Sequence, residues 1–181
     1  MCGRTRDNRL RQGRSMEGIR VNRLVVVLGT AHELQGAEKR GGNRSDPLYE
    51  ELLKDLVVED ELDFIFEEAT GLGPTTAEKV SLALGPNRYL DVDPSREERV
   101  KFGIPENTNQ PFMVGYPPDA GFADKVFHEV HAKREQLWSE RIAKREFKKA
   151  LMICGANHTL SFAFRLCASN FTVKAVTYMP R

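Results

Sequence analysis

The chain has 181 residues, of which 40% are hydrophobic and 29% are charged, and its formal net charge is +1. This length fits one domain of about 100 to 200 residues, and the composition is that of a globular protein with enough apolar side chains for a core. The small net charge excludes a general electrostatic attraction to nucleic acid or anionic membranes, and no apolar run reaches the roughly 20 residues that span a bilayer.

Residues 1–22 form a basic segment that differs from the rest of the chain. The segment has almost no large apolar side chains, and it lacks the apolar centre of a secretory signal. Because such a composition cannot bury a core, we predict a disordered tail at 1–22, or an upstream extension that ends before Met16, followed by a single domain over 23–181. The alternative is a basic arm for nucleic acid or another acidic partner. The arginines of the segment are Arg4, Arg6, Arg9, Arg11, Arg14 and Arg20.

Apolar runs and helical spacings alternate from residue 24 onward. Residues 24–28 are a continuous apolar run that ends at Gly29, which predicts a strand covered on both faces. Ser45 or Asp46 can cap the next helix, which has Pro47 in its first turn. The elements expected after that helix are a strand at 62–66, a helix at 75–84, a strand at 88–92 and a short helix at 96–102.

The second half of the chain begins with a proline-rich segment at 103–120, which we expect to be a long loop. Strands that alternate with helices predict a single α/β domain with a mostly parallel central sheet flanked by helices. In such sheets, ligands bind beyond the carboxyl ends of the strands. The remaining expected elements are a long helix at 122–149, a buried strand at 150–154, a helix at 159–169 and a strand at 171–178.

The three cysteines, Cys2, Cys154 and Cys167, match no zinc or disulfide framework. Cys154 lies in an apolar run and Cys167 lies in an amphipathic helical pattern, so we expect both to be buried and reduced. Reduced cysteines, together with the lack of a secretory signal, favour a cytoplasmic location.

Two Gly-x-x-His segments directly follow predicted strands, and they end at His32 and His158. Each glycine permits a sharp turn or a close backbone approach, and adjacent parallel strands would bring the two histidines together. A carboxylate from Glu67 or Glu68 would complete a ligand set of two nitrogens and one oxygen, which suits a catalytic divalent metal. Because adjacent strand residues point to opposite faces, we expect only one glutamate to reach the site and slightly favour Glu67. Alternatively, each histidine only bonds a loop or caps the following helix.

A further carboxylate and one face of the long helix supply other candidates. Asp93 follows the third strand, where it is either a site residue or a turn residue before a proline. Arg134, Trp138 and Arg141 share one helix face because of their i, i+4, i+7 spacing. Trp138 should be buried, and an arginine beside it can point at a site carboxylate or an anionic substrate. The alternative is an exposed face whose arginines pair with neighbouring glutamates.

Other signals are weaker or absent. His128 and His131 lie three residues apart on the long helix, and we expect both to be surface residues. The sequence has no P-loop, no dinucleotide-binding glycine motif after a strand and no nucleophile-elbow serine motif.

The candidate motifs together resemble those of a known superfamily. A Gly-Thr-x-His closes the first strand, a Glu-Glu closes the second, an Arg-Glu lies on the long helix and a Gly-x-x-His comes late. This combination, spread over most of residues 24–178, resembles the Tiki/TraB superfamily, which also includes ChaN-like and erythromycin-esterase-like proteins. The resemblance to the Tiki branch implies metal-dependent peptide cleavage, with Arg134 supporting the metal set. ChaN-like members instead bind haem, and the esterase branch opens a lactone.

We therefore expect a divalent-metal-dependent hydrolase that acts on a peptide or ester bond of a peptide or small-molecule substrate. His32, Glu67 and His158 would hold a zinc, manganese or cobalt ion. Such an ion would lower the pKa of a bound water toward neutrality.

The remaining candidates would support the chemistry. Glu68 or Asp93 would act as the general base, and Arg134 would stabilise the developing oxyanion. The alternative function is a non-catalytic protein that binds a small ligand or an anion in the same pocket, with the anion at the amino end of the helix that begins at Thr159. We expect no membrane association, and nucleic-acid binding only through the basic tail.

Overall fold

The computed structural model describes residues 23–35, 46–69, 74–104 and 120–178. The basic segment and most of the expected loop at 103–120 lie outside these ranges. Five strands form one sheet in the order β3-β2-β4-β1-β5, and all paired neighbours run parallel. This confirms the predicted α/β class with a parallel sheet. The strands are β1 (Leu24–Thr30), β2 (Phe64–Glu67), β3 (Tyr89–Asp91), β4 (Lys149–Gly155) and β5 (Thr172–Tyr178).

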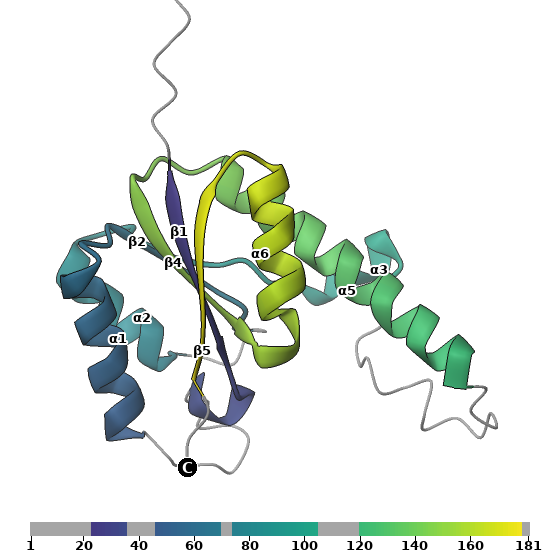
Figure 1. The fold of residues 1–181 in the computed structure, drawn as a ribbon, viewed down its shortest axis with the longest axis horizontal. Helices are drawn as coiled ribbons and strands as arrows, with labels where there is room; N and C mark the ends of the chain where they lie inside the picture. Colours follow the sequence, from purple (N-terminus) through teal and green to yellow (C-terminus); the bar gives the residue numbers. More distant parts are fainter. Residues whose placement is uncertain (1–22, 36–45, 70–73, 105–119, 179–181) are drawn as a thin grey trace, which may run out of the picture.

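Helices cover both faces of this sheet, so the molecule has three layers (Figure 1). Helices α1 (Pro47–Glu59) and α2 (Thr76–Ser81) pack on one face, and α5 (Ala120–Ala143) and α6 (Thr159–Ala168) pack on the other. The short α3 (Arg96–Phe102) follows β3. Among the described residues, no helix combines the length and the apolarity needed to cross a membrane.

Strand β1 shows why the central strands are apolar throughout. Val25 and Val27 belong to the core cluster beneath α5 and α6, whereas Val26 and Leu28 belong to the cluster beneath α1 and α2. All four side chains are fully buried. Burying a side chain of this size contributes about 1.5–3 kcal/mol, so a polar residue on either face would lose that contribution.

The helix boundaries follow local signals at some ends and tertiary packing at others. Asp46 caps α1, because its Oδ1 accepts a hydrogen bond from the backbone N–H of Leu48 at 3.0 Å. Helix α5 ends at Ala143, although the pattern predicted helix up to residue 149. The reason is that the chain must turn into β4, and Phe147 packs in the core against the rings of Phe66 and Phe171.

The two described cysteines differ in exposure. Cys154 in β4 is buried, as expected, and burial raises the pKa of its thiol. Cys167 in α6 is exposed, so the expectation of burial was wrong. Helix α6 buries Phe162 and Leu166, and the residue after Leu166 is rotated by about 100° away from that face.

Candidate functional site

The pairing of β1 with β4 brings the two Gly-x-x-His segments to the same edge of the sheet. Thr30 at the end of β1 lies opposite Gly155 at the end of β4. The short 3₁₀ helices η1 (His32–Gln35) and η4 (Ala156–His158) then carry the two histidines. The expected placement of both motifs beyond neighbouring carboxyl ends is therefore confirmed.

Both glycines of these motifs allow neighbouring groups to approach the backbone closely. Neither has a positive φ, so backbone conformation is not the reason for glycine at these positions. A Cβ added to Gly29 would lie 1.7 Å from Oγ1 of Thr159, at the start of α6. A Cβ added to Gly155 would lie 2.7 Å from Nε2 of His32, so the His32 ring rests directly against that glycine. The ring is also tied by its Nδ1 to Oε1 of Gln35 at 2.9 Å. The missing side chains thus make room for the elements that form the site.

Glu68, directly after β2, is the carboxylate that lies with the histidines. Its side chain is 1% exposed, and Oε2 accepts a hydrogen bond from the backbone N–H of Gly155 at 2.9 Å. Its Oε1 forms an ion pair with Arg134 and lies 3.9 Å from Nε2 of His32. Burial alone would raise the pKa of Glu68, but Arg134, then His158 and His32, and the Gly155 N–H together hold it below its usual value.

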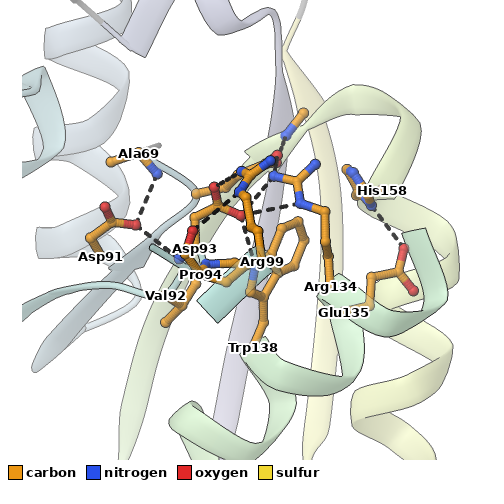
Figure 2. A network of polar contacts seen from close by, with 12 residues as sticks. Ala69, Asp91, Val92, Asp93, Pro94, Arg99, Arg134, Glu135, Trp138 and His158 are labelled. Carbon is orange, nitrogen blue, oxygen red and sulfur yellow. Dashed lines mark hydrogen bonds and ion pairs between the residues drawn. The ribbon is translucent and has the colours of Figure 1, made fainter. Parts of the chain in front are cut away.

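Arg134 on α5 connects Glu68 with a second carboxylate, Asp93. Figure 2 shows Arg134, Arg99 and Trp138 around Asp93. Its Nη2 and Nε lie 2.7 and 3.1 Å from Oδ1 of Asp93. Trp138 Nε1 donates to the same oxygen at 3.4 Å, and Arg99 pairs with the other oxygen. Asp93 is 6% exposed and both its oxygens are occupied, which places it behind Arg134 as a support.

The predicted face of Arg134, Trp138 and Arg141 is confirmed, because all three contact Asp93. Trp138 is fully buried, as expected for the only tryptophan. Arg141 donates through Nη1 to the carbonyl oxygen of Asp93 at 2.9 Å, and its Nη2 lies 2.5 Å from Oε1 of Glu98. The arginines of this face therefore point at carboxylates at the sheet edge and do not pair with the glutamates of their own helix.

Glu67 lies on the opposite face of the sheet. Its Oε2 accepts hydrogen bonds from Oγ1 of Thr75 at 2.5 Å and from the hydroxyl of Tyr89 at 2.8 Å. Its Oε1 is buried and has no hydrogen-bond partner among the described residues. Burial raises the pKa of Glu67 to about 7, against the effect of the two hydrogen bonds. The structure therefore does not bring Glu67 to the histidines, and the preference for Glu67 over Glu68 is corrected, because the last residue of β2 faces α2.

A second cluster joins His158 to helix α5 and can hold a metal ion. One donor atom from each of His131, Glu135 and His158 lies within 4.8 Å of the others. Nδ1 of His158 is 2.9 Å from Oε1 of Glu135, and the same oxygen accepts a hydrogen bond from Oγ of Ser161 at 2.6 Å. The rings of His131 and His158 stack with their centroids 4.0 Å apart.

The chemistry of this donor set fits a divalent ion. Glu135 and His158 are buried, and His131 is half-buried. Burial, assisted by His158 and Arg134, lowers the pKa of His131 to about 4, so its ring is uncharged at neutral pH and offers a lone pair. Tetrahedral ligands at about 2.0–2.1 Å from zinc stand about 3.3 Å apart, so donors separated by up to 4.8 Å reach this spacing by rotation of their side chains.

This cluster shares only one member, His158, with the metal set expected from the sequence. His131 was expected at the surface, but its ring packs on His158. The spacing of His131 and Glu135 at i, i+4 on one helix face was the available signal. That signal could not identify His158 as the third member, because the crossing of α5 over the start of α6 depends on tertiary packing. Among the described residues, His32 and Glu67 belong to no such group of donors.

The chain was also compared with known proteins, and no protein-family model, curated protein or solved structure matches it.

Proposed function

We propose that the protein is a divalent-metal-dependent hydrolase that cleaves a peptide or ester bond and holds its ion with His131, Glu135 and His158. The observation that carries this proposal is the convergence of two imidazoles and one carboxylate within 4.8 Å, from two elements at the carboxyl edge of a parallel sheet. Two nitrogens and one oxygen leave a coordination position open, as in catalytic zinc sites. An ion bound there supplies Lewis acidity, which polarises a carbonyl group and lowers the pKa of water.

The neighbouring residues have distinct roles in this proposal. Glu68 is held by Arg134 with a lowered pKa, which makes it a poor proton acceptor but a good anchor for His32. The His32 side chain is 43% exposed and its Nε2 lies 3.9 Å from the Glu68 carboxylate. His32 is therefore the member of this group that is open to substrate and solvent. Arg134 is neutralised by Glu68 and Asp93, so it acts as a positioning residue.

The same geometry argues against a site for a free anion. The carboxylates of Glu68, Asp93 and Glu135 lie near Arg134, which is the one buried cation among the described residues and is already paired with the first two. An anion at the start of α6 would lie close to Glu135, which accepts a hydrogen bond from Ser161 in the first turn of that helix. Because like charges repel strongly where water is excluded, the cluster favours a cation.

Zinc titration of the full chain, followed by calorimetry, tests the ligand set. We expect His131→Ala and His158→Ala each to weaken zinc binding by at least about tenfold, since removal of even an outer-shell partner typically costs 10- to 100-fold. His128→Ala is the matched control, because it removes an imidazole one turn earlier on α5 and should leave binding unchanged. Zinc binding that depends on His32 and not on His131 would contradict this ligand set and support the set expected from the sequence.

Hydrolysis assays test the reaction class separately. We expect cleavage of a nitrophenyl ester or a fluorogenic peptide to require added zinc, manganese or cobalt, and to be abolished by a chelator and by His158→Ala. His32→Ala should lower kcat while zinc affinity is retained, because His32 lies outside the ligand group. Tight zinc binding without cleavage of any ester or peptide would contradict the hydrolase and leave a metal-binding protein.

A further inference from the structure

The opposite edge of the sheet carries a large open pocket. Its volume is about 680 Å³, and its lining comes from residues that precede β1, β2 and β3 and from the connection between α5 and β4. In a parallel sheet the amino ends of all strands lie at one edge, so this pocket is at the far end of the strands from the candidate metal group. None of its lining residues belongs to that group.

The lining is strongly basic. Five cationic side chains contribute to it but only two carboxylates, Asp63 and Glu146. The net charge of the whole chain is only +1, so a lining with five cations and two carboxylates is more positive than the chain as a whole. The five cations are Arg23, Arg88, Lys144, Arg145 and Lys148.

The cations of the pocket are not neutralised by carboxylates. Arg23 donates to the carbonyl oxygens of Ala143 and Arg145 at 3.3 and 3.0 Å, and its guanidinium lies over the ring of Phe147 at 5.1 Å. Asp63 is engaged by backbone N–H groups, among them that of Lys148 at 3.0 Å.

Two lysines elsewhere on the described surface are paired with carboxylates. Lys54 pairs with Glu50 and Lys174 pairs with Asp60, both between side chains. Within the described ranges, no salt bridge joins a pocket cation to a carboxylate. Apart from Arg23, which bonds two backbone carbonyl oxygens, the cations of the pocket are therefore available to an external anion.

We propose that this pocket binds the phosphodiester backbone of nucleic acid without regard to sequence. Several separate cations around one open pocket suit a series of phosphates better than a single phosphate group. The sequence directly before Arg23 carries six more arginines, so the positive charge continues along the chain from the pocket. Phe147 is 7% exposed and covered by Arg23, so no aromatic face is free to stack on a base. Contacts to phosphates position a protein on nucleic acid but carry no sequence information.

Fluorescence anisotropy with a labelled 20-base-pair DNA duplex tests this proposal on the full chain. We expect Arg88→Glu combined with Lys148→Glu to weaken binding at low salt by at least about tenfold. The matched control is Lys54→Glu combined with Lys174→Glu, which changes the net charge equally at another surface and should change affinity less than about threefold. With Arg88→Gln and Lys148→Gln, the slope of log affinity against log salt should fall by about 2, roughly one for each lost phosphate contact.

Several outcomes would overturn the pocket as the binding site. One is the absence of duplex binding at low salt, and another is equal weakening by the two charge-reversed pairs, which would show a general charge effect. A third outcome combines two variants: replacing the six arginines of 1–22 by serine abolishes binding, whereas the variant with Arg88→Gln and Lys148→Gln binds as tightly as the wild type. That result would show that the basic segment alone binds the duplex. Displacement of the duplex by ATP, added at a concentration equal to that of the duplex phosphates, would show that the pocket binds a small phosphorylated ligand and not nucleic acid. Circular dichroism of each variant excludes misfolding as the cause.

Discussion

Glu67 and Glu68 are adjacent, identical in chemistry and both buried at the end of β2, yet they have opposite electrostatic environments. Among the described residues, Glu67 receives hydrogen bonds only from the hydroxyls of Thr75 and Tyr89, and burial raises its pKa to about 7. Glu68 is paired with Arg134 and accepts the N–H of Gly155, and its pKa is lowered. The difference arises because consecutive residues of an extended chain point to opposite faces of the sheet.

The comparison shows that the partner, and not the residue type or its burial, sets the charge of a buried carboxyl. Burial penalises the charged form of both side chains. Only on the side of α5 does a cation compensate for that penalty, and there the polar cluster continues to His158. Hydroxyl groups on the other side satisfy one oxygen of Glu67 and leave the second without a partner among the described residues.

Removing the cation should have the largest effect. Arg134→Met leaves Glu68 and Asp93 buried without their shared partner, and we expect a loss of about 3–5 kcal/mol in the free energy of unfolding at pH 7. Urea unfolding measures this loss. Arg134→Lys is the control, since it keeps the charge without the planar fork and should recover part of the stability. A loss below about 1 kcal/mol for Arg134→Met would show that the ion pair is not what distinguishes the two glutamates.

Substituting each glutamate should produce pH effects of opposite sign. The pKa of Glu67 is about 7 in the folded chain and 4.5 as a reference, so the folded state holds its proton more tightly. The stability of the wild type should therefore fall as pH rises from 4.5 to 7, by up to about 3 kcal/mol from this group. Glutamine does not titrate, so Glu67→Gln should not lose this stability. The free energy of unfolding of the variant minus that of the wild type should therefore increase from pH 4.5 to 7. Urea unfolding at several pH values between 4 and 8 measures this difference.

Glu68→Gln is the matched variant for the pH series. The lowered pKa of Glu68 contributes stability that is present above the reference value of 4.5 and is lost as pH falls through the folded value. We expect Glu68→Gln to be less stable than the wild type at pH 7, with the difference shrinking in acid. If both variants showed the same pH dependence, the contrast between the two faces would be wrong.

Adding a methyl group at each motif glycine should give smaller and unequal effects. Gly29→Ala places its Cβ 1.7 Å from Oγ1 of Thr159 and 3.2 Å from the backbone of Ala156, which we expect to cost about 1–3 kcal/mol. Gly155→Ala meets mainly the outer end of the His32 ring, so it should cost less than about 1 kcal/mol but move that ring away from Glu68. Thermal unfolding and the NMR titration of His32 measure the two effects. An equal loss of stability at both positions would contradict the proposed packing of His32 on Gly155.

The central strands and their order along the chain could be predicted because the pattern of each is local. The apolar runs of β1 and β4 need cover on both faces, and the cap at Asp46 and the helix at Arg96–Phe102 follow from short-range signals. Where tertiary packing overrides a local pattern, prediction failed. The end of α5 is set by the burial of Phe147, and the exposure of Cys167 is set by the face of α6 that meets the sheet.

The sequence by itself determined that each Gly-x-x-His motif follows a buried strand and lies at the carboxyl edge of a parallel sheet, because all strands of such a sheet end at one edge. The pairing of β1 with β4, which makes the two motifs neighbours, was decided by the tertiary structure. The sequence also did not determine which carboxylates join the histidines. The assignment of Glu68, and the joining of His131 and Glu135 to His158, depend on where α5 crosses the sheet. That crossing is decided by side-chain packing between residues far apart in the chain, such as Trp138 and Phe162, and local patterns do not contain it.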